Sequence, residues 1–228
     1  MEDNKENVND AQNQDNNDLD ESIKVVLIGE SGVGKTSIIS QFTKGVFNTD
    51  LMSTNGATFC TKKKEFKEFK QTISFEIWDT AGQERYRSLA KMFFKDAAVA
   101  LIVYDITSKK SYDEIKNYWM NLVKENGPKQ IIMYIVGNKS DLIEQVNEEE
   151  VRKYAESEGI SFWLTSAKNF IGIDELFVEI GKKYLSPEFS NNEEIIQRKK
   201  RKSEVSKVNK EAAVLQNNQT GGKKGCCG

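Results

Sequence analysis

The chain has 228 residues, with 33 Lys and Arg, 35 Asp and Glu, three cysteines, no histidine and a net charge of −2. Without histidine there is no Ser-His-Asp or Cys-His catalysis, no H-E-x-x-H zinc site and no imidazole proton shuttle, and three cysteines alone make a structural zinc site a poor expectation. The length fits one domain with tails and is ample for a hydrophobic core.

The charge is distributed unevenly along the chain. Residues 1–21 hold eight acids and one lysine, whereas residues 186–228 hold nine Lys and Arg and five Glu. The polar composition of both ends cannot bury enough apolar surface to offset the entropy of ordering. We therefore expect a disordered acidic extension at 1–21, a folded domain at 22–185 and a flexible tail at 186–228.

The sequence favours a cytosolic protein. Residues 1–21 lack the basic and apolar regions of a signal peptide. The longest apolar stretch, 97–104, is far shorter than the ~20 residues that cross a bilayer. The cysteine spacing does not suggest a disulfide framework either.

Patterns of strands and helices alternate between the two ends. Continuous apolar runs indicate strands buried on both faces, alternation indicates half-buried strands, and apolar residues three or four apart indicate helices. In chain order we expect a strand at 23–28, a helix at 35–43, paired strands at 57–66 and 72–78, a strand at 99–104, a helix from Ser108 or Ser111 to Val123, a strand at 131–136, a helix around 151–155, a strand at 161–165 and a helix at 173–184. This alternation predicts an α/β domain with a mainly parallel sheet.

The segment 29–36 reads GESGVGKT and matches the phosphate-binding pattern G-x-x-x-x-G-K-[ST]. Its glycines would let backbone N–H groups surround phosphates at a helix N-terminus, with Lys35 at the β- and γ-phosphates and the Thr36 hydroxyl on Mg²⁺. The alternative is a glycine-rich turn before an ordinary exposed helix start. Its position between a predicted strand and a predicted helix favours phosphate binding, but an ATPase would share this loop.

The segment 138–141 reads NKSD and follows the predicted strand at 131–136. The Asp141 carboxylate can accept hydrogen bonds from both N–H groups on the Watson–Crick edge of guanine, and adenine presents a different donor pattern. The alternative is a strand-end Asn138 with a solvated Lys139 and Asp141. Because ligands bind at the carboxyl ends of strands in open α/β sheets, the position favours a guanine site.

Five motifs occur in the order and approximate spacing of a Ras-like small GTPase, specifically of the Rab family. They are GESGVGKT at 29–36, Thr54, WDTAGQE at 78–84, NKSD at 138–141 and TSAK at 165–168. The resemblance covers residues 22–185 and implies a P-loop NTPase fold, a three-layer α/β/α small G domain with a six-stranded, mainly parallel sheet. Ala57 and the segment 85–94 are most similar to the early-endosomal branch, whereas Asn55 replaces the usual Ile.

The resemblance also implies a binding site for GTP or GDP and Mg²⁺. Its nucleotide-binding positions are Gly29, Glu30, Ser31, Gly32, Val33, Gly34, Lys35, Thr36, Ser37, Phe47, Thr54, Gly82, Asn138, Lys139, Asp141, Ser166, Ala167 and Lys168. Thr36, Thr54 and Asp79 are the implied metal-binding residues, and Gln83, Lys35 and Thr54 the catalytic ones, with Gln83 orienting the attacking water. Phe59, Trp78 and Phe93 match a cluster that faces effectors, with a buried core cluster as the alternative.

The tail carries a basic run at 198–202 and ends in Gly-Cys-Cys-Gly. The run alone would also suit nucleic acid or a solvated helix extension. The resemblance instead implies that Cys226 and Cys227 carry two geranylgeranyl groups, which anchor a chain stably where one group binds marginally.

The resemblance implies a regulator of vesicle trafficking that hydrolyses GTP slowly on the cytosolic face of endomembranes, expected to be the early endosome, and that binds no nucleic acid. The implied partners are an exchange factor, a GTPase-activating protein, effectors, a prenylation escort protein and a GDP-dissociation inhibitor. Two rivals are a P-loop ATPase or kinase-type enzyme and a GTP-dependent interaction module without hydrolysis.

Overall fold

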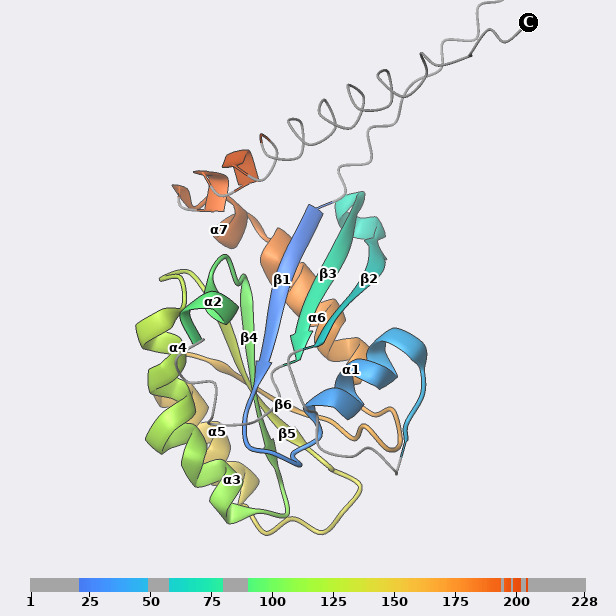
Figure 1. Cartoon of the computed structure of the whole chain (residues 1–228), viewed down its shortest axis with the longest axis vertical. Coiled ribbons are helices and arrows are strands. Elements are labelled where there is room, and N and C mark those ends of the chain that lie inside the picture. Colours follow the sequence, from blue (N-terminus) through green and yellow to red (C-terminus); the bar gives the residue numbers. More distant parts are fainter. Residues whose placement is uncertain are drawn as a thin grey trace, which may run out of the picture.

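The computed structural model describes residues 21–48, 58–79, 90–193, 195–197, 199–201 and 204. Within these residues a single sheet has the order β2-β3-β1-β4-β5-β6, and only β2 runs antiparallel to its neighbour (Figure 1). The strands are β1 Glu21–Ile28, β2 Thr58–Phe66, β3 Gln71–Asp79, β4 Val99–Asp105, β5 Ile132–Asn138 and β6 Ser161–Leu164. The prediction of a six-stranded, mainly parallel sheet is confirmed.

Helices follow most of the strands, as the alternating patterns predict. They are α1 Lys35–Lys44, α2 Ala90–Phe94, α3 Lys109–Glu114, α4 Met120–Asn126, α5 Glu148–Ser157, α6 Ile173–Leu185 and α7 Pro187–Ser190. Helix α3 continues into α4 through a π-helical turn at Ile115–Trp119. Of the two starts considered for this helix the structure has the first, because the Ser108 side chain accepts a hydrogen bond from the Ser111 N–H and caps α3.

The core has one layer on each face of the sheet, because neighbouring residues of a strand point to opposite faces. Val25 and Leu27 of β1 pack with α1 and α6, whereas Val26 and Ile28 pack with α2, α3, α4 and α5. In Figure 1 these two groups of helices flank the sheet. The expected three-layer α/β/α arrangement is thus confirmed.

Aromatic packing fixes α1 against α6. The Phe42 ring of α1 stacks on the Phe177 ring of α6 with centroids 3.6 Å apart, and both rings meet Phe75 of β3 edge-on at 5.7 and 5.4 Å. All three side chains are fully buried. This cluster fixes the position of α1 against α6 and β3, and the glycine-rich segment joins the end of β1 to the start of α1.

The chain after α6 differs from the expectation of a tail without packing. Helix α7 begins at Pro187 and is capped by Ser186, whose side chain accepts a hydrogen bond from the Phe189 N–H. Farther on, Ile195 is only 3% exposed. The boundary at 185 stays a prediction, but the first part of the predicted tail contributes an apolar side chain to the core. Among the described residues no helix is long and apolar enough to cross a membrane.

Candidate functional site

The turn between β1 and α1 requires glycine at two positions. Gly29 has φ +137°, and a Cβ there would lie 2.1 Å from the Val103 carbonyl oxygen of β4. Gly34 has φ +99°, and its Cβ would lie 2.2 Å from the Asn138 side-chain nitrogen of β5. L-residues with side chains rarely adopt these conformations. The glycine-rich segment therefore closes directly against the ends of β4 and β5.

Lys35 begins α1 and is 5% exposed. Its Nζ donates hydrogen bonds to the carbonyl oxygens of Gly29 and Glu30, both at 2.8 Å. Burial lowers the pKa of this amine from 10.5 to about 8, against the opposing attraction of Asp79. The segment thus folds back over its own lysine and holds a partly desolvated cation at its centre.

Thr36 and Asp79 bring the first turn of α1 to the end of β3. The Thr36 hydroxyl donates to Oδ2 of Asp79 at 2.5 Å, and Asp79 is 1% exposed. Burial raises the pKa of this carboxyl, although Thr36 and Lys35 favour its charged form. Its Oδ1 is buried and has no hydrogen-bond partner among the described residues.

An unsatisfied buried carboxylate oxygen beside a hydroxyl is a fitting environment for Mg²⁺, which prefers a few oxygen ligands and retains several waters. In the described part of the chain no three His, Cys, Asp or Glu residues come together to hold a metal. A metal here would therefore depend on Thr36, Asp79 and ligands from elsewhere.

Asn138 connects three segments that are far apart in the sequence. It is 1% exposed, and its Nδ2 donates to the Val33 carbonyl oxygen at 2.9 Å. Its Oδ1 accepts hydrogen bonds from the Thr165 hydroxyl and the Ala167 N–H, both at 3.2 Å. One buried amide thus fixes the glycine-rich segment, the end of β5 and the loop after β6 relative to one another.

The two charged residues that follow Asn138 are each held by one partner. Lys139 has φ +69°, and its Nζ lies 2.6 Å from Oδ2 of Asp105. Asp141 accepts a hydrogen bond from the Ser166 hydroxyl at 2.6 Å. Asp105 was missed in the sequence analysis, although a charged residue directly after the buried strand 99–104 was a usable signal.

The loop after β6 is tied to α1 as well. Gln41, which the sequence analysis also missed, donates from Nε2 to the Ala167 carbonyl oxygen at 2.7 Å. Gln41 and Ala167 are 126 residues apart in the sequence, so no local pattern indicates that Gln41 supports the site. Thr165, Ser166 and Ala167 are buried, whereas Lys168 is exposed.

The structure places most of the predicted nucleotide site at the carboxyl ends of β1, β3, β5 and β6. The segment 29–37, Asp79, the segment 138–141 and the segment 165–168 all lie there. Phe47 follows α1 and is 36% exposed. A hollow of about 190 Å³ adjoins this region, and its lining includes Glu30, Ser31, Gly32, Val33, Asp105, Ser108, Lys110 and Ser111. Thr54, Gly82, Gln83, Cys226 and Cys227 lie outside the described residues.

The proposed aromatic cluster is partly brought together. Phe59 is 54% exposed, and its ring lies 5.2 Å from the Trp78 ring at an angle of 60°. Phe93 is 8% exposed and belongs to the core cluster on which Trp78 packs. Lys24 reinforces the arrangement, since its Nζ lies 4.4 Å from the Trp78 ring and donates to the Lys95 carbonyl oxygen at 3.0 Å.

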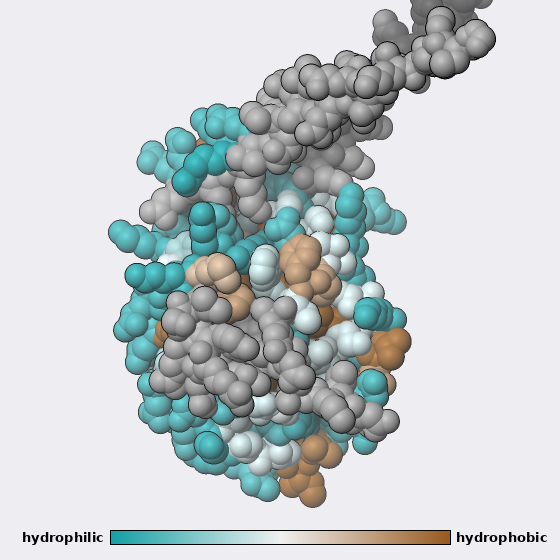
Figure 2. All heavy atoms as spheres, viewed as in Figure 1, coloured by the Kyte–Doolittle hydropathy of each residue, from teal (hydrophilic) through white to brown (hydrophobic). Residues whose placement is uncertain are grey.

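Hydrophobic side chains on the surface are scattered rather than continuous in the view of Figure 2, where hydrophilic residues dominate the described area. Several of the exposed large apolar residues flank the site. Leu142 and Ile143 follow the NKSD segment, and Phe170 and Ile171 follow the TSAK segment.

Comparison with known proteins identifies the family. The Ras family model matches residues 24–186. The chain belongs to the Ras family. It is 44% identical to human Ras-related protein Rab-22A over 163 residues, which are 71% of this chain and 82% of that protein.

Two further relatives are similar to this Ras-family protein over comparable lengths. The mouse Ras-related protein Rab-31 is 44% identical over 174 residues, 75% of this chain and 88% of that protein. The rice Ras-related protein Rab5A is 43% identical over 164 residues, 71% of this chain and 79% of that protein. The resemblance to Rab-type small GTPases is thereby confirmed, and the chain is a GTPase of this group.

Proposed function

We propose that this chain is a membrane-associated switch that binds GTP and hydrolyses it slowly to GDP and phosphate. The observation that carries the proposal is the contact network of Asn138, because it joins the phosphate-binding segment to both segments expected to bind guanine. A phosphate loop alone would suit any nucleoside triphosphate. A phosphate loop fixed to a guanine site favours GTP.

Asp141 recognises the guanine base. Its carboxylate accepts hydrogen bonds from the two N–H groups of the guanine edge, and the Ser166 hydroxyl at 2.6 Å holds it in position. Lys139, fixed by Asp105 at 2.6 Å, covers the base together with the backbone of Ala167 and the ring of Phe47.

The phosphates are bound by the segment 29–37. On binding, Lys35 exchanges the carbonyl oxygens of Gly29 and Glu30 for phosphate oxygens, which are better partners for a buried cation. Thr36 and Asp79, with Thr54, would hold Mg²⁺, which when bound neutralises developing negative charge on the phosphates. The Oδ1 of Asp79, which has no hydrogen-bond partner within the part of the chain that the structure describes, supports this assignment.

Hydrolysis requires positioning rather than covalent catalysis, which suits a chain without histidine. We assign the orientation of the attacking water to Gln83 and expect an intrinsic rate of about 10⁻⁴ to 10⁻³ s⁻¹, as for the related Ras, with a partner supplying a catalytic arginine. Phe59, Trp78 and Phe93 would present the nucleotide state to effectors.

Membrane attachment completes the proposal. Lipidation at Cys226 and Cys227 would place the chain on the cytosolic face of endosomal membranes, where an exchange factor, a GTPase-activating protein and effectors act on it. A prenylation escort protein and a GDP-dissociation inhibitor would carry the lipidated form through the cytosol. The similarity to Rab-22A, Rab-31 and Rab5A supports this setting.

Nucleotide competition with the Asp141→Asn variant tests the base assignment. Each of the two charged hydrogen bonds is worth about 1.5–3 kcal/mol, so the loss of the carboxylate should weaken GTP binding by about 100-fold or more while xanthosine triphosphate binding improves. The Glu144→Gln variant, an exposed site three residues farther along, should leave both affinities unchanged. Equal GTP and ATP binding by the unaltered chain would overturn the proposal.

Single-turnover phosphate release tests the hydrolysis step. The Gln83→Leu variant should bind GTP normally and release phosphate about 10- to 100-fold more slowly, because the water is no longer oriented. Unchanged release would contradict the role of Gln83. A wild-type chain that binds GTP and releases no phosphate over many hours would instead be an interaction module without hydrolysis.

A further inference from the structure

One charged residue interrupts the apolar run of β1. Lys24 lies between Ile23 and Val25 in this strand and is only 9% exposed. It lies two residues before Val26, so it faces the layer that contains α2, α3, α4 and α5. Lysine is rarely buried unless its ammonium group has partners that replace water. The burial of Lys24 therefore indicates a specific role for its charge.

The ammonium group of Lys24 reaches the end of α2. Its Nζ donates hydrogen bonds to the carbonyl oxygens of Lys95 at 3.0 Å and of Met92 at 3.5 Å. The Ala98 N–H donates in turn to the Lys24 carbonyl oxygen at 2.8 Å. Carbonyl groups at the end of a helix lack partners within the helix, and a cation is favourable there. Lys24 thus caps α2 from the neighbouring strand.

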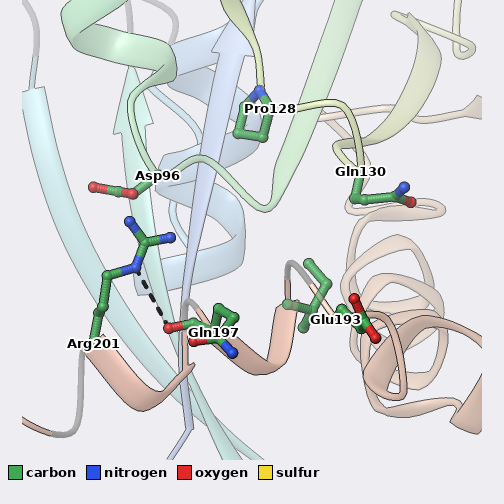
Figure 3. A pocket seen from close by; sticks show the side chains of 7 residues that line it. Asp96, Pro128, Gln130, Glu193, Gln197 and Arg201 are labelled. Carbon is green, nitrogen blue, oxygen red and sulfur yellow. Dashed lines mark hydrogen bonds between the residues drawn. The ribbon is translucent and has the colours of Figure 1, made fainter.

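Helix α2 depends on such contacts because it has only five residues, too few for a helix that is stable by itself. The chain turns after it at Asp96, which has φ +58° and is exposed. Asp96 lines a groove of about 410 Å³, and the Arg201 guanidinium extends toward it from the tail (Figure 3). Exposed charges contribute little to order. The buried contact with Lys24 is the better restraint on this turn.

The same ammonium group contacts the aromatic cluster. Its Nζ lies 4.4 Å from the centroid of the Trp78 ring, within the range of a cation–π interaction. The Trp78 ring in turn lies 5.2 Å from the ring of Phe59 in β2. Phe93 of α2 belongs to the buried cluster on which Trp78 packs. One cation thus links the end of α2 to the tryptophan of β3.

We propose that Lys24 is a positioning residue for the cluster of Phe59, Trp78 and Phe93. Its ammonium group fixes the end of α2 and the Trp78 ring relative to each other, so that β3 and α2 present one surface of defined geometry. That this surface presents the nucleotide state to effectors rests on the proposed function. Lys24 acts away from the phosphates, since Gly29 is five residues farther along, roughly 16 Å in an extended chain.

A fixed end of α2 matters to a protein partner. Met92 of α2 is 58% exposed, and Phe59, which lies against Trp78, is 54% exposed. A partner that contacts both side chains binds more tightly when their separation is already set, because binding then orders fewer groups. Lys24 would contribute to affinity in this way without touching the partner.

Fluorine NMR of the full-length chain labelled with fluorotryptophan tests the positioning. The chain has three tryptophans, and the Trp78→Phe variant identifies the Trp78 signal. Lys24→Met keeps an unbranched side chain but has no ammonium group, so the Trp78 signal should shift or broaden more than the other two. Lys24→Arg restores a cation with several donors and should move the signal back toward its original position.

The Lys62→Met variant is the matched control. Lys62 Nζ lies 4.5 Å from the Phe42 ring centroid and donates to the Phe42 carbonyl oxygen. Lys62 is three residues from Phe59 on β2, so the two side chains lie on opposite faces of the sheet. The control removes the same kind of contact far from α2 and should leave the Trp78 signal in place. An unchanged Trp78 signal in Lys24→Met, or an equal change in the control, would overturn the proposal.

Hydrogen exchange measures the end of α2 directly. The N–H groups of Lys95 and Ala97 close this turn through hydrogen bonds of 3.0 Å each. In Lys24→Met both should exchange about tenfold or more faster, because the charged hydrogen bonds that hold the turn are lost. The Gly45 N–H, which closes α1 at 2.9 Å, should exchange as before. Unchanged exchange at Lys95 and Ala97 would contradict the role of Lys24.

A further measurement is independent of whether Lys24→Met folds. In the unaltered chain the methylene protons beside the Nζ of Lys24 should resonate upfield of those of exposed lysines, because the Trp78 ring shields them. An ordinary chemical shift would overturn the proposal whatever the variants do.

Binding of fluorescent GDP separates this inference from the proposed function. Lys24→Met should bind it as tightly as the unaltered chain, and weaker binding would make Lys24 part of the nucleotide site instead. Failure of the unaltered chain to bind GDP would contradict the proposed switch, whereas the Trp78 signal and the exchange rates would still report what Lys24 positions.

Discussion

Lys35 and Asp79 are opposite charges that the fold buries before any ligand arrives. Burial shifts the pKa of each group toward its neutral form, downward to about 8 for Lys35 and upward for Asp79. Lys35 is held by two carbonyl oxygens at 2.8 Å, and one oxygen of Asp79 has no partner among the described residues. A ligand that supplies phosphate oxygens and a metal would satisfy both groups.

The affinity for GDP should therefore fall as the pH rises through about 8. A phosphate favours the charged amine, so the Lys35 pKa rises on binding, and above about pH 8 binding must take up a proton. The affinity should decrease by up to about tenfold per pH unit, as measured by titration of fluorescent GDP between about pH 7 and pH 9.

The Lys35→Arg variant provides the control for this experiment. Its guanidinium keeps its proton over the whole range, so its affinity, although weaker, should not follow the same pH profile. A flat profile for the unaltered chain would contradict the role of Lys35.

The residues that could be predicted from the sequence are those whose motifs are local. Lys35, Thr36 and Asp141 lie in short patterns with a fixed relation to a strand end, so the sequence alone indicated their place. Asp105 and Gln41 support the site through contacts with Lys139 and Ala167 that are distant in the sequence. The position of Asp105 directly after a buried strand was a usable local signal. Its pairing with Lys139, and the contact of Gln41, depend on which strands and loops become neighbours, and no local pattern contains that information.

At the scale of elements, periodicity predicted most strands and helices but not their arrangement. The predicted helix at 173–184 is α6, and the paired strands at 57–66 and 72–78 are β2 and β3. The position of β1 between β3 and β4 follows from right-handed connections and packing on both faces, which a hydrophobic pattern does not record. The π-helical turn at 115–119 was likewise not predictable, because its extra residue leaves the apolar spacing almost unchanged.

Contact between α6 and β2 gives a test at this scale. Gly181 of α6 is buried against Phe66 of β2, and a Cβ on Gly181 would lie 2.0 Å from the Phe66 ring. The Gly181→Ala variant should lose about 1–3 kcal/mol of unfolding free energy through overpacking, less the gain of about 1 kcal/mol in helix propensity. Urea denaturation measures the net loss.

The Phe66→Leu substitution makes room for the new methyl group. The double variant should therefore lose less unfolding free energy than the two single variants lose together. Such non-additivity indicates direct contact between the two positions. Strictly additive losses would show that the ring does not limit this position.

At the scale of the whole molecule, the folded unit extends beyond the last long helix. Composition predicted a polar tail from 186 onward, and most of its residues are indeed polar. Phe189 packs against the core, and Ile195 is buried farther along the chain. Composition averaged over a long segment does not detect a few anchoring side chains, because many polar and charged neighbours dilute their contribution.

The Ile195→Ser variant should release this segment. Burial of an isoleucine is worth about 1.5–3 kcal/mol, so trypsin should cleave after Lys199 and Lys200 about tenfold or more faster, as followed by mass spectrometry of short digests. The neighbouring Ile196 is 36% exposed. Its replacement by serine adds the same hydroxyl and should leave the cleavage rate nearly unchanged; equal acceleration in both variants would disprove the anchoring.

The position of β2 at one edge of the sheet also bears on how crowded copies of this chain behave. Lys62, Lys63 and Lys64 follow one another along it, and the ammonium group of Lys64 pairs with Asp174 of α6 at 2.7 Å. A second copy adding its own β2 to this edge would align two rows of like charge in close proximity. Strand β2 thereby opposes edge-to-edge growth of the sheet into fibres, and it does so most strongly at low ionic strength.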